Sequence, residues 1–205
     1  MKRIIGAAFA ALLSTTAIAQ VNVVPQVGVS SAVITRNTYS SVALALPPAA
    51  SATDIACIAG SSTKTVYVDK ITISGSAGTL VSAPFTLVRR TSVDSGGTAA
   101  TTTANWANNI AKHDTSSPAN TATLISYSTN PTINDTAPDY IASDYLTLPV
   151  TSAGTSIDPI EWVWPNTSFS QRPTLRGTAA QFCINLNAVS VSSGLLHVSI
   201  QWTEE

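Results

Sequence analysis

The sequence predicts an all-β protein, an antiparallel, jelly-roll-like β-sandwich with about eight or nine strands and one long projecting loop. Hydrophobic residues alternate with polar ones over most of the chain, and no stretch has the spacing of an amphipathic helix. Turn-forming residues separate the alternating stretches, as is typical of sandwiches and jelly rolls. Charged residues make up only 10% of the 205 residues, against about 25% in ordinary globular proteins. Serine, threonine, alanine and asparagine take the place of charged residues. The hydroxyl-rich surfaces that result are typical of secreted β-proteins, virion proteins and adhesins.

The last two strands have the clearest pattern. Residues 196–202 place every second large apolar side chain on one face, and residues 182–186 do the same. The short link at 192–194 predicts that these strands pair as a hairpin. We expect their apolar face to anchor the core, through the residues Phe182, Ile184, Leu186, Leu196, Val198, Ile200 and Trp202.

Shorter alternating stretches predict the remaining strands, at residues 42–46, 65–74, 85–89, 124–127, 145–148, 160–164 and 174–176. The phase of alternation changes near Asp69 and Lys70, so a bulge or bend is expected there. Residues 91–120 are polar, with Trp106 and Ile110 as their main large apolar residues. Since loops of this length are usually functional or contact a neighbour, we expect this one to project from the sandwich.

The N-terminus has the pattern of a secretory signal peptide. Lys2 and Arg3 precede an apolar stretch at 4–13, and Ala17 and Ala19 supply a small-x-small cleavage site. The alternative is a hydrophobic arm that stays attached. The apolar stretch is shorter than the about 20 residues that span a bilayer, so no membrane contact is expected once the leader is removed. The predicted parts are a signal peptide or arm, an extended segment and the sandwich domain, at residues 1–19, 20–47 and 48–205.

The charge distribution argues against nucleic acid as a partner. The net charge is -1, and after the leader Arg89 and Arg90 form the only adjacent pair of positive residues. Binding to a phosphate backbone needs several clustered cations.

The two cysteines, Cys57 and Cys183, allow one disulfide in an oxidising compartment. The alternative is two separate buried thiols, because free cysteine is among the most buried residue types. The sequence leaves both open.

No motif predicts an enzyme or a metal site. His113 and Asp114 form the only adjacent histidine–carboxylate pair, and His197 is the only other histidine. We expect Asp114 to cap a turn and His113 to be solvated. No cofactor is expected; calcium is the alternative, with oxygen ligands from the acidic residues Asp135, Asp139, Asp144, Asp158 and Glu161.

Three tryptophans are candidate binding residues. Trp162 and Trp164 fall with Ile160 on one strand face, where they could form a platform for sugar rings or part of the core; the core is favoured. Trp106 lies in the polar loop, so we expect it to dock on a neighbouring subunit or a ligand.

From about residue 38 onward, the chain resembles a group of β-rich proteins encoded among the virion genes of tailed bacteriophages. The stretches that carry the resemblance are 48–55 (PAASATDI), 60–66 (GSSTKTV), 87–91 (LVRRT), 96–98 (GGT), 113–114 (HD), 127–131 (YSTNP) and 199–205 (SIQWTEE). These motifs are structural, and the resemblance implies a head-decoration, fibre or tail accessory protein without implying any site residue. The leader departs from this group, because phage structural proteins normally assemble in the cytoplasm.

The expected function is therefore that of a non-enzymatic structural protein in a virion or an exported surface assembly. It would act as a homo-oligomer, with a trimer as one option, and pack against other virion or surface proteins. The alternative is a carbohydrate- or receptor-binding module that contacts a host glycan.

Overall fold

The computed structural model describes residues 36–135, 137–151, 158–165, 171–191 and 193–205. The predicted leader and the first part of the extended segment lie outside the described residues. The described part contains two short 3₁₀ helices, η1 (Thr102–Ala104) and η2 (Trp106–Asn108). Its twelve strands are β1 (Asn37–Leu46), β2 (Ala52–Ala59), β3 (Thr65–Ser76), β4 (Val81–Arg90), β5 (Thr98–Ala99), β6 (Ala111–Lys112), β7 (Thr123–Thr129), β8 (Asp139–Leu148), β9 (Ile160–Val163), β10 (Thr174–Arg176), β11 (Gln181–Val189) and β12 (Leu195–Glu204).

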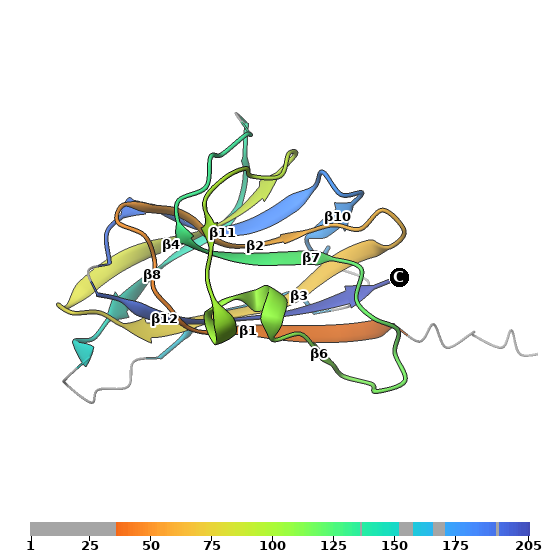
Figure 1. The fold of residues 1–205 in the computed structure, drawn as a ribbon, viewed down its shortest axis with the longest axis horizontal. Helices are drawn as coiled ribbons and strands as arrows, with labels where there is room; N and C mark the ends of the chain where they lie inside the picture. Colours follow the sequence, from red (N-terminus) through yellow and green to blue (C-terminus); the bar gives the residue numbers. More distant parts are fainter. Residues whose placement is uncertain (1–35, 136, 152–157, 166–170, 192) are drawn as a thin grey trace, which may run out of the picture. The chain divides into compact units, whose positions relative to one another are not determined.

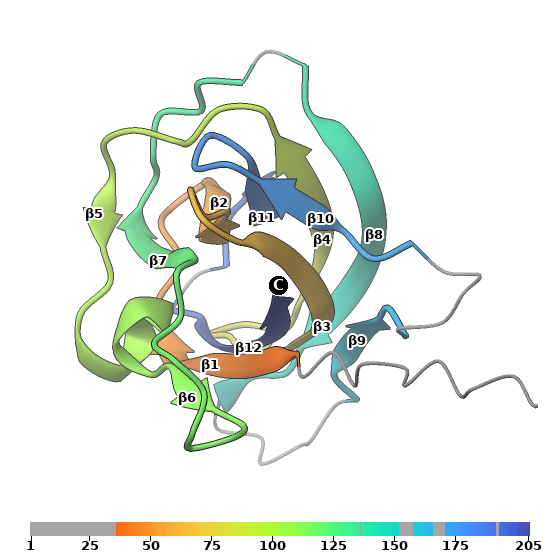
Figure 2. The same cartoon turned by 90° about the vertical axis from the view of Figure 1, so that its right-hand side faces the viewer.

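The strands form two six-stranded antiparallel sheets that face each other (Figures 1 and 2). We call them sheet A and sheet B. Sheet A has the order β10-β3-β12-β1-β6, and β9 also pairs with β3. Sheet B has the order β5-β7-β2-β11-β4-β8. The predicted all-β sandwich is confirmed.

The strand pairs are nested, as in a long hairpin that has been rolled up. β1 pairs with β12, β2 with β11, β3 with β9 and β10, and β4 with β8. Successive pairs alternate between sheet A and sheet B, which is the topology of a jelly roll. β5, β6 and β7 come from an insertion between β4 and β8.

Side chains that alternate inward from both sheets fill the core. All seven residues that the sequence placed in the core are buried, and the rings of Tyr39 and Trp202 stack with centroids 5.5 Å apart. The predicted hairpin of the last two strands is wrong, because β11 belongs to sheet B and β12 to sheet A. Two strands that each have one apolar face can pair within one sheet or face each other across the core from two sheets. The alternation is the same in both arrangements.

The bulge predicted near Asp69 and Lys70 is confirmed. In the pairing of β3 with β12, Lys70 lies opposite Gln201 and Val68 opposite Trp202, so that Asp69 is the extra residue. The bulge turns the Asp69 carboxylate toward Thr203 and Arg172, which both donate hydrogen bonds to it.

Three other expectations need correction. The strand count is twelve among the described residues, because β5 and β6 are too short to show a period and β2 is buried on both faces and so does not alternate. The sandwich includes Asn37–Leu46, since β1 pairs with both β12 and β6, and therefore begins before residue 48. Residues 91–120 do not project. They lie along the sandwich, where β5 pairs with β7 and β6 with β1, and thus connect the two sheets at one side (Figure 2).

No helix in the described part of the chain has the length and hydropathy needed to cross a bilayer.

Candidate functional site

Trp106 is a core residue and not a surface anchor, which corrects the sequence prediction. Its side chain is 1% exposed, and its indole Nε1 donates a hydrogen bond to the Val198 carbonyl at 2.9 Å. Its backbone accepts a hydrogen bond from the Ser41 hydroxyl and donates one to Ser126. η2, which begins at Trp106, packs against β1 and β7 and places the ring in the core at this side of the sandwich. The loop is polar because its outer side is solvated, while its one large ring closes this side of the core.

Trp162 and Trp164 lie at the other side of the sandwich, in β9 and just after it. Both are half-buried and pack against the core, as the favoured prediction stated. Trp164 meets the ring of Phe182 in sheet B edge to face, with centroids 6.1 Å apart. The two tryptophans thus contribute to the core between the sheets and do not form a free, flat platform.

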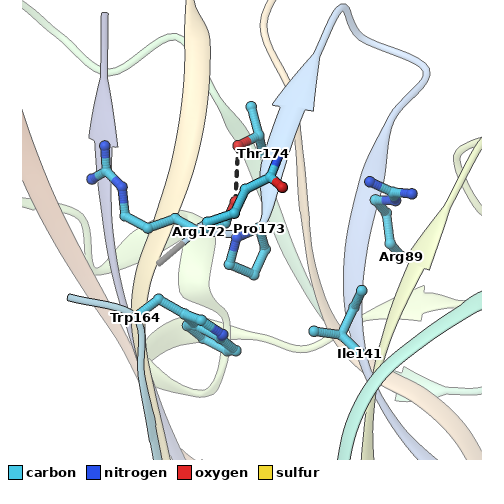
Figure 3. A pocket seen from close by; sticks show the side chains of 7 residues that line it. Arg89, Ile141, Trp164, Arg172, Pro173 and Thr174 are labelled. Carbon is cyan, nitrogen blue, oxygen red and sulfur yellow. Dashed lines mark hydrogen bonds between the residues drawn. The ribbon is translucent and has the colours of Figure 1, made fainter. Parts of the chain in front are cut away.

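Trp164 borders two clefts, one of about 330 Å³ and a smaller one of about 190 Å³, which is below the about 300–1,000 Å³ usual for ligand sites. The smaller cleft is the one between Trp164 and Arg89. Its two arginines already have partners: Arg172 is paired with Asp69 and stacks on Tyr67, and Arg89 is paired with Asp139. The cleft therefore offers few unpaired polar groups to a ligand. Figure 3 shows its lining, which consists of Arg89, Ile141, Trp164, Arg172, Pro173 and Thr174 together with Gln171.

A buried polar cluster lies on the outer face of sheet B, away from the core. Cys57 in β2 and Cys183 in β11 are directly opposite each other and form a disulfide with a Cα–Cα distance of 4.2 Å. Of the two alternatives that the sequence left open, the structure has the bridge and not two separate thiols. Tyr127 of β7 packs against the disulfide, and the segment after β4 covers it through Asp94.

Asp54 and Arg90 form a bidentate ion pair in this cluster. Arg90 Nε and Nη2 donate to the Asp54 carboxylate at 2.6 and 2.8 Å, and the Asn185 amide donates to the same carboxylate. The side chains of Asp54 and Arg90 are almost completely buried. Burial would lower the pKa of Arg90, but the hydrogen bond and charge of Asp54 outweigh it and raise this pKa.

Asp94 is the second carboxyl of the cluster and has much poorer support. Its side chain is fully buried, its Oδ1 has no hydrogen-bond partner, and this atom lies 3.9 Å from Arg90 Nε. Its Oδ2 is 3.8 Å from Cys57 Sγ. Burial, together with the hydrogen bond and charge of Asp54, raises the pKa of Asp94 to about 7. The cluster has one arginine for two carboxyl groups, so Asp94 keeps a proton at pH values below about 7.

Sequence reasoning missed this cluster. One signal was available: Asp54 lies within an otherwise apolar strand, three residues before Cys57. A charged residue in such a strand needs a buried partner. The partners Arg90 and Asp94 come from another part of the chain, where nothing in the sequence connects them with Asp54.

The acidic residues considered for calcium do not gather in the described part of the chain. The Asp135 carboxylate accepts backbone hydrogen bonds from residues 91 and 137, Asp139 is paired with Arg89, and Glu161 is paired with Lys70. The group of close ligand atoms in the described residues comprises Asp54, Cys57, Asp94 and Cys183.

The histidines give no sign of catalysis. His113 and His197 are both exposed, and neither belongs to this group of ligand atoms. Asp114 caps a turn by accepting hydrogen bonds from Ser116, as predicted, and these bonds lower its pKa.

β8 is one of the two edge strands of sheet B, and it has ten residues, whereas the other edge strand, β5, has two. Among the described strands, only β4 pairs with β8 along the length of β8. Leu146 and Leu148 point into the core, and the alternation places Tyr145 on the outer face. Tyr140 and Tyr145 are 70% and 69% exposed. Both lie opposite β4 residues whose side chains point away from the core, so the two rings share the outer face of sheet B. A long edge with exposed tyrosines is suited to pairing with another chain.

Comparison of the chain with protein-family models, with curated proteins and with solved structures gave no match. The resemblance to phage virion proteins therefore stays a prediction from the sequence.

Proposed function

We propose that the chain is a non-enzymatic structural protein of a phage virion or of an exported surface assembly, and that it packs against copies of itself through β8. The observation that carries this proposal is the ten-residue edge strand with two tyrosines exposed on one face.

Three features support an assembly role. An unpaired strand edge can add a strand from a second copy, with backbone hydrogen bonds that do not depend on sequence. Tyrosines are enriched at protein interfaces because a rigid ring buries a large area and its hydroxyl keeps a polar contact. Jelly rolls occur in viral capsid and lectin domains, although this is an analogy at the level of fold.

Ile141 modifies the edge. In the pairing of β8 with β4, Ala142 lies opposite Leu87 and Tyr140 opposite Val88, which makes Ile141 a bulge residue. Bulges limit uncontrolled pairing at sheet edges. The edge from 142 to 148 is regular, so the pairing we propose runs along this part and includes Tyr145.

The test is analytical ultracentrifugation of the full chain over a wide concentration range. We expect an oligomer that dissociates at least tenfold more readily when Tyr140 and Tyr145 are both replaced by lysine. The control variant is Leu80→Lys, which changes a residue that is 68% exposed but lies in the turn before β4. A wild-type chain that stays monomeric at all concentrations contradicts the proposal, as does equal weakening by Leu80→Lys.

Export is the second part of the proposal, because a virion protein and a surface protein differ in whether the leader is removed. N-terminal mass analysis of the native protein distinguishes them. A chain that begins at Gln20 supports an exported assembly, and an intact Met1 or Lys2 supports assembly in the cytoplasm.

Carbohydrate binding is the second candidate function, and one observation favours it: the half-buried ring of Trp164 borders an open cleft that also contains Gln171 and Thr174. A glycan array compares the wild type with Trp164→Ala and with Leu80→Ala as control. Binding that only Trp164→Ala abolishes would favour this second function.

A further inference from the structure

We propose that the reduced chain binds one zinc ion, or a similar thiol-seeking divalent cation, through Asp54, Cys57, Asp94 and Cys183. In this proposal the disulfide is the oxidised, metal-free state of the same site. It concerns the outer face of sheet B and is independent of the β8 edge.

The positions of the ligand atoms fit such an ion. One carboxylate oxygen from each aspartate and the two sulfur atoms all lie within 4.8 Å of one another. Zinc takes four ligands in a tetrahedron, with about 2.3 Å to sulfur and about 2.0–2.2 Å to carboxylate oxygen, so its ligand atoms are roughly 3.3–3.8 Å apart. Once the sulfur–sulfur bond opens, the directly opposed cysteines can move apart while their strands stay paired. Small side-chain rotations then suffice to place four ligands around one ion.

Asp94 supplies the independent sign that the cluster lacks a ligand. Its side chain is completely buried, and its Oδ1 is a polar atom without a hydrogen-bond partner. A buried polar atom without a hydrogen bond is costly. Here it faces the disulfide and the Asp54–Arg90 pair, where a cation would satisfy it.

The surroundings would hold the ligands in place. Arg90 and Asn185 donate hydrogen bonds to the Asp54 carboxylate, and the Asp94 backbone donates one to the Gln181 side chain at 2.8 Å. Partners of this kind orient metal ligands and strengthen binding. The charges also come close to balance, because two thiolates and two carboxylates carry four negative charges, while zinc and Arg90 supply three positive ones.

The redox step balances with an external dithiol as the reductant. The Cys57–Cys183 bond accepts two electrons and two protons from the dithiol, which becomes a disulfide. Zinc then binds as both thiols lose their protons, and the proton held by Asp94 is released as well. The thiolates make zinc a better fit than calcium, which takes oxygen ligands.

The experiment loads metal during refolding, because the cluster is buried in the folded chain. The full chain is unfolded, reduced with a phosphine and refolded with either cobalt or zinc chloride. We expect one metal per chain by native mass spectrometry and a thiolate-to-cobalt charge-transfer band in the near ultraviolet. The oxidised chain, treated identically without reductant, should bind at least tenfold less.

Asp94→Asn should weaken metal binding at least tenfold, and Asp144→Asn, which changes an exposed carboxylate on β8, should not change it. The oxidised form of Asp94→Asn serves as a check that this variant folds. The proposal is overturned if the reduced chain folds with two titratable thiols in excess zinc, or if it fails to fold with zinc present. It is also overturned if the oxidised chain binds the metal equally well.

Discussion

Replacing Trp106 by alanine should cost about 3–5 kcal/mol of unfolding free energy, the range for buried aromatic residues in well-packed cores. The ring is 1% exposed and lies at the side of the sandwich where the Trp106 backbone bonds to Ser41 of β1 and Ser126 of β7. Its loss leaves a cavity at that side and removes the indole N–H that the Val198 carbonyl accepts. Because the lost indole hydrogen bond adds about 0.5–1.5 kcal/mol, the cost should fall in the upper part of the range.

Urea unfolding followed by circular dichroism measures this cost. Trp106→Phe keeps most of the apolar volume and should cost less than the alanine variant, while Leu80→Ala, at an exposed position, should stay within about 0.5 kcal/mol of wild type. A loss below about 1.5 kcal/mol for Trp106→Ala, against the about 3–5 expected, would refute the conclusion that the ring fills the core.

Three further predictions concern the disulfide, the buried carboxyl and the core. Reducing the Cys57–Cys183 bridge, which joins residues 126 apart, should cost about 4–5 kcal/mol in the chain-entropy model; thermal melts with a chelator present would disprove this if the midpoint did not change. Since the folded chain holds a proton on Asp94, with its pKa raised from 3.8 to about 7, this group's stabilisation is complete below pH 3.8 and is lost as the pH rises through 7. At about 1.4 kcal/mol per pKa unit, the loss of unfolding free energy is at most about 4 kcal/mol. Urea unfolding between pH 4 and 8 should therefore show a smaller decline in unfolding free energy for Asp94→Asn than for the wild type. Parallel pH profiles of the two proteins would contradict this prediction. Ile200→Ala should cost about 2–5 kcal/mol, and an unchanged urea midpoint would show that β12 does not face the core.

The alternation in the sequence predicted which side chains point inward but not which strands are neighbours. Phe182 and Ile200 were both placed in the core correctly, yet their strands face each other across the sandwich and do not pair. Alternation states only that one face of a strand is apolar, and it contains no information on the partner. β5 and β6 could not be predicted for a different reason, because two residues are too few to show alternation.

Trp106 and the buried cluster show the same limit at the level of single residues. The neighbours of Trp106 in the sequence are polar, and the Val198 carbonyl that binds it is 92 residues away. Asp54 meets Arg90 over 36 residues and Asn185 over 131. The disulfide was one of the two alternatives that the sequence allowed, because two cysteines leave only one pairing.

The nested order of the strands has a consequence for how the chain acquires its structure. β12 is synthesised after the other eleven described strands, yet it lies between β1 and β3 in the middle of sheet A. Until it arrives, β1 and β3 border a slot that is one strand wide. Folding of sheet A must therefore wait for β12, and contacts of this long range make it slow. A chain that ends at residue 194 should keep this slot open, and a peptide with the sequence of residues 195–205, or the same strand of a second chain, could fill it in the register of β12.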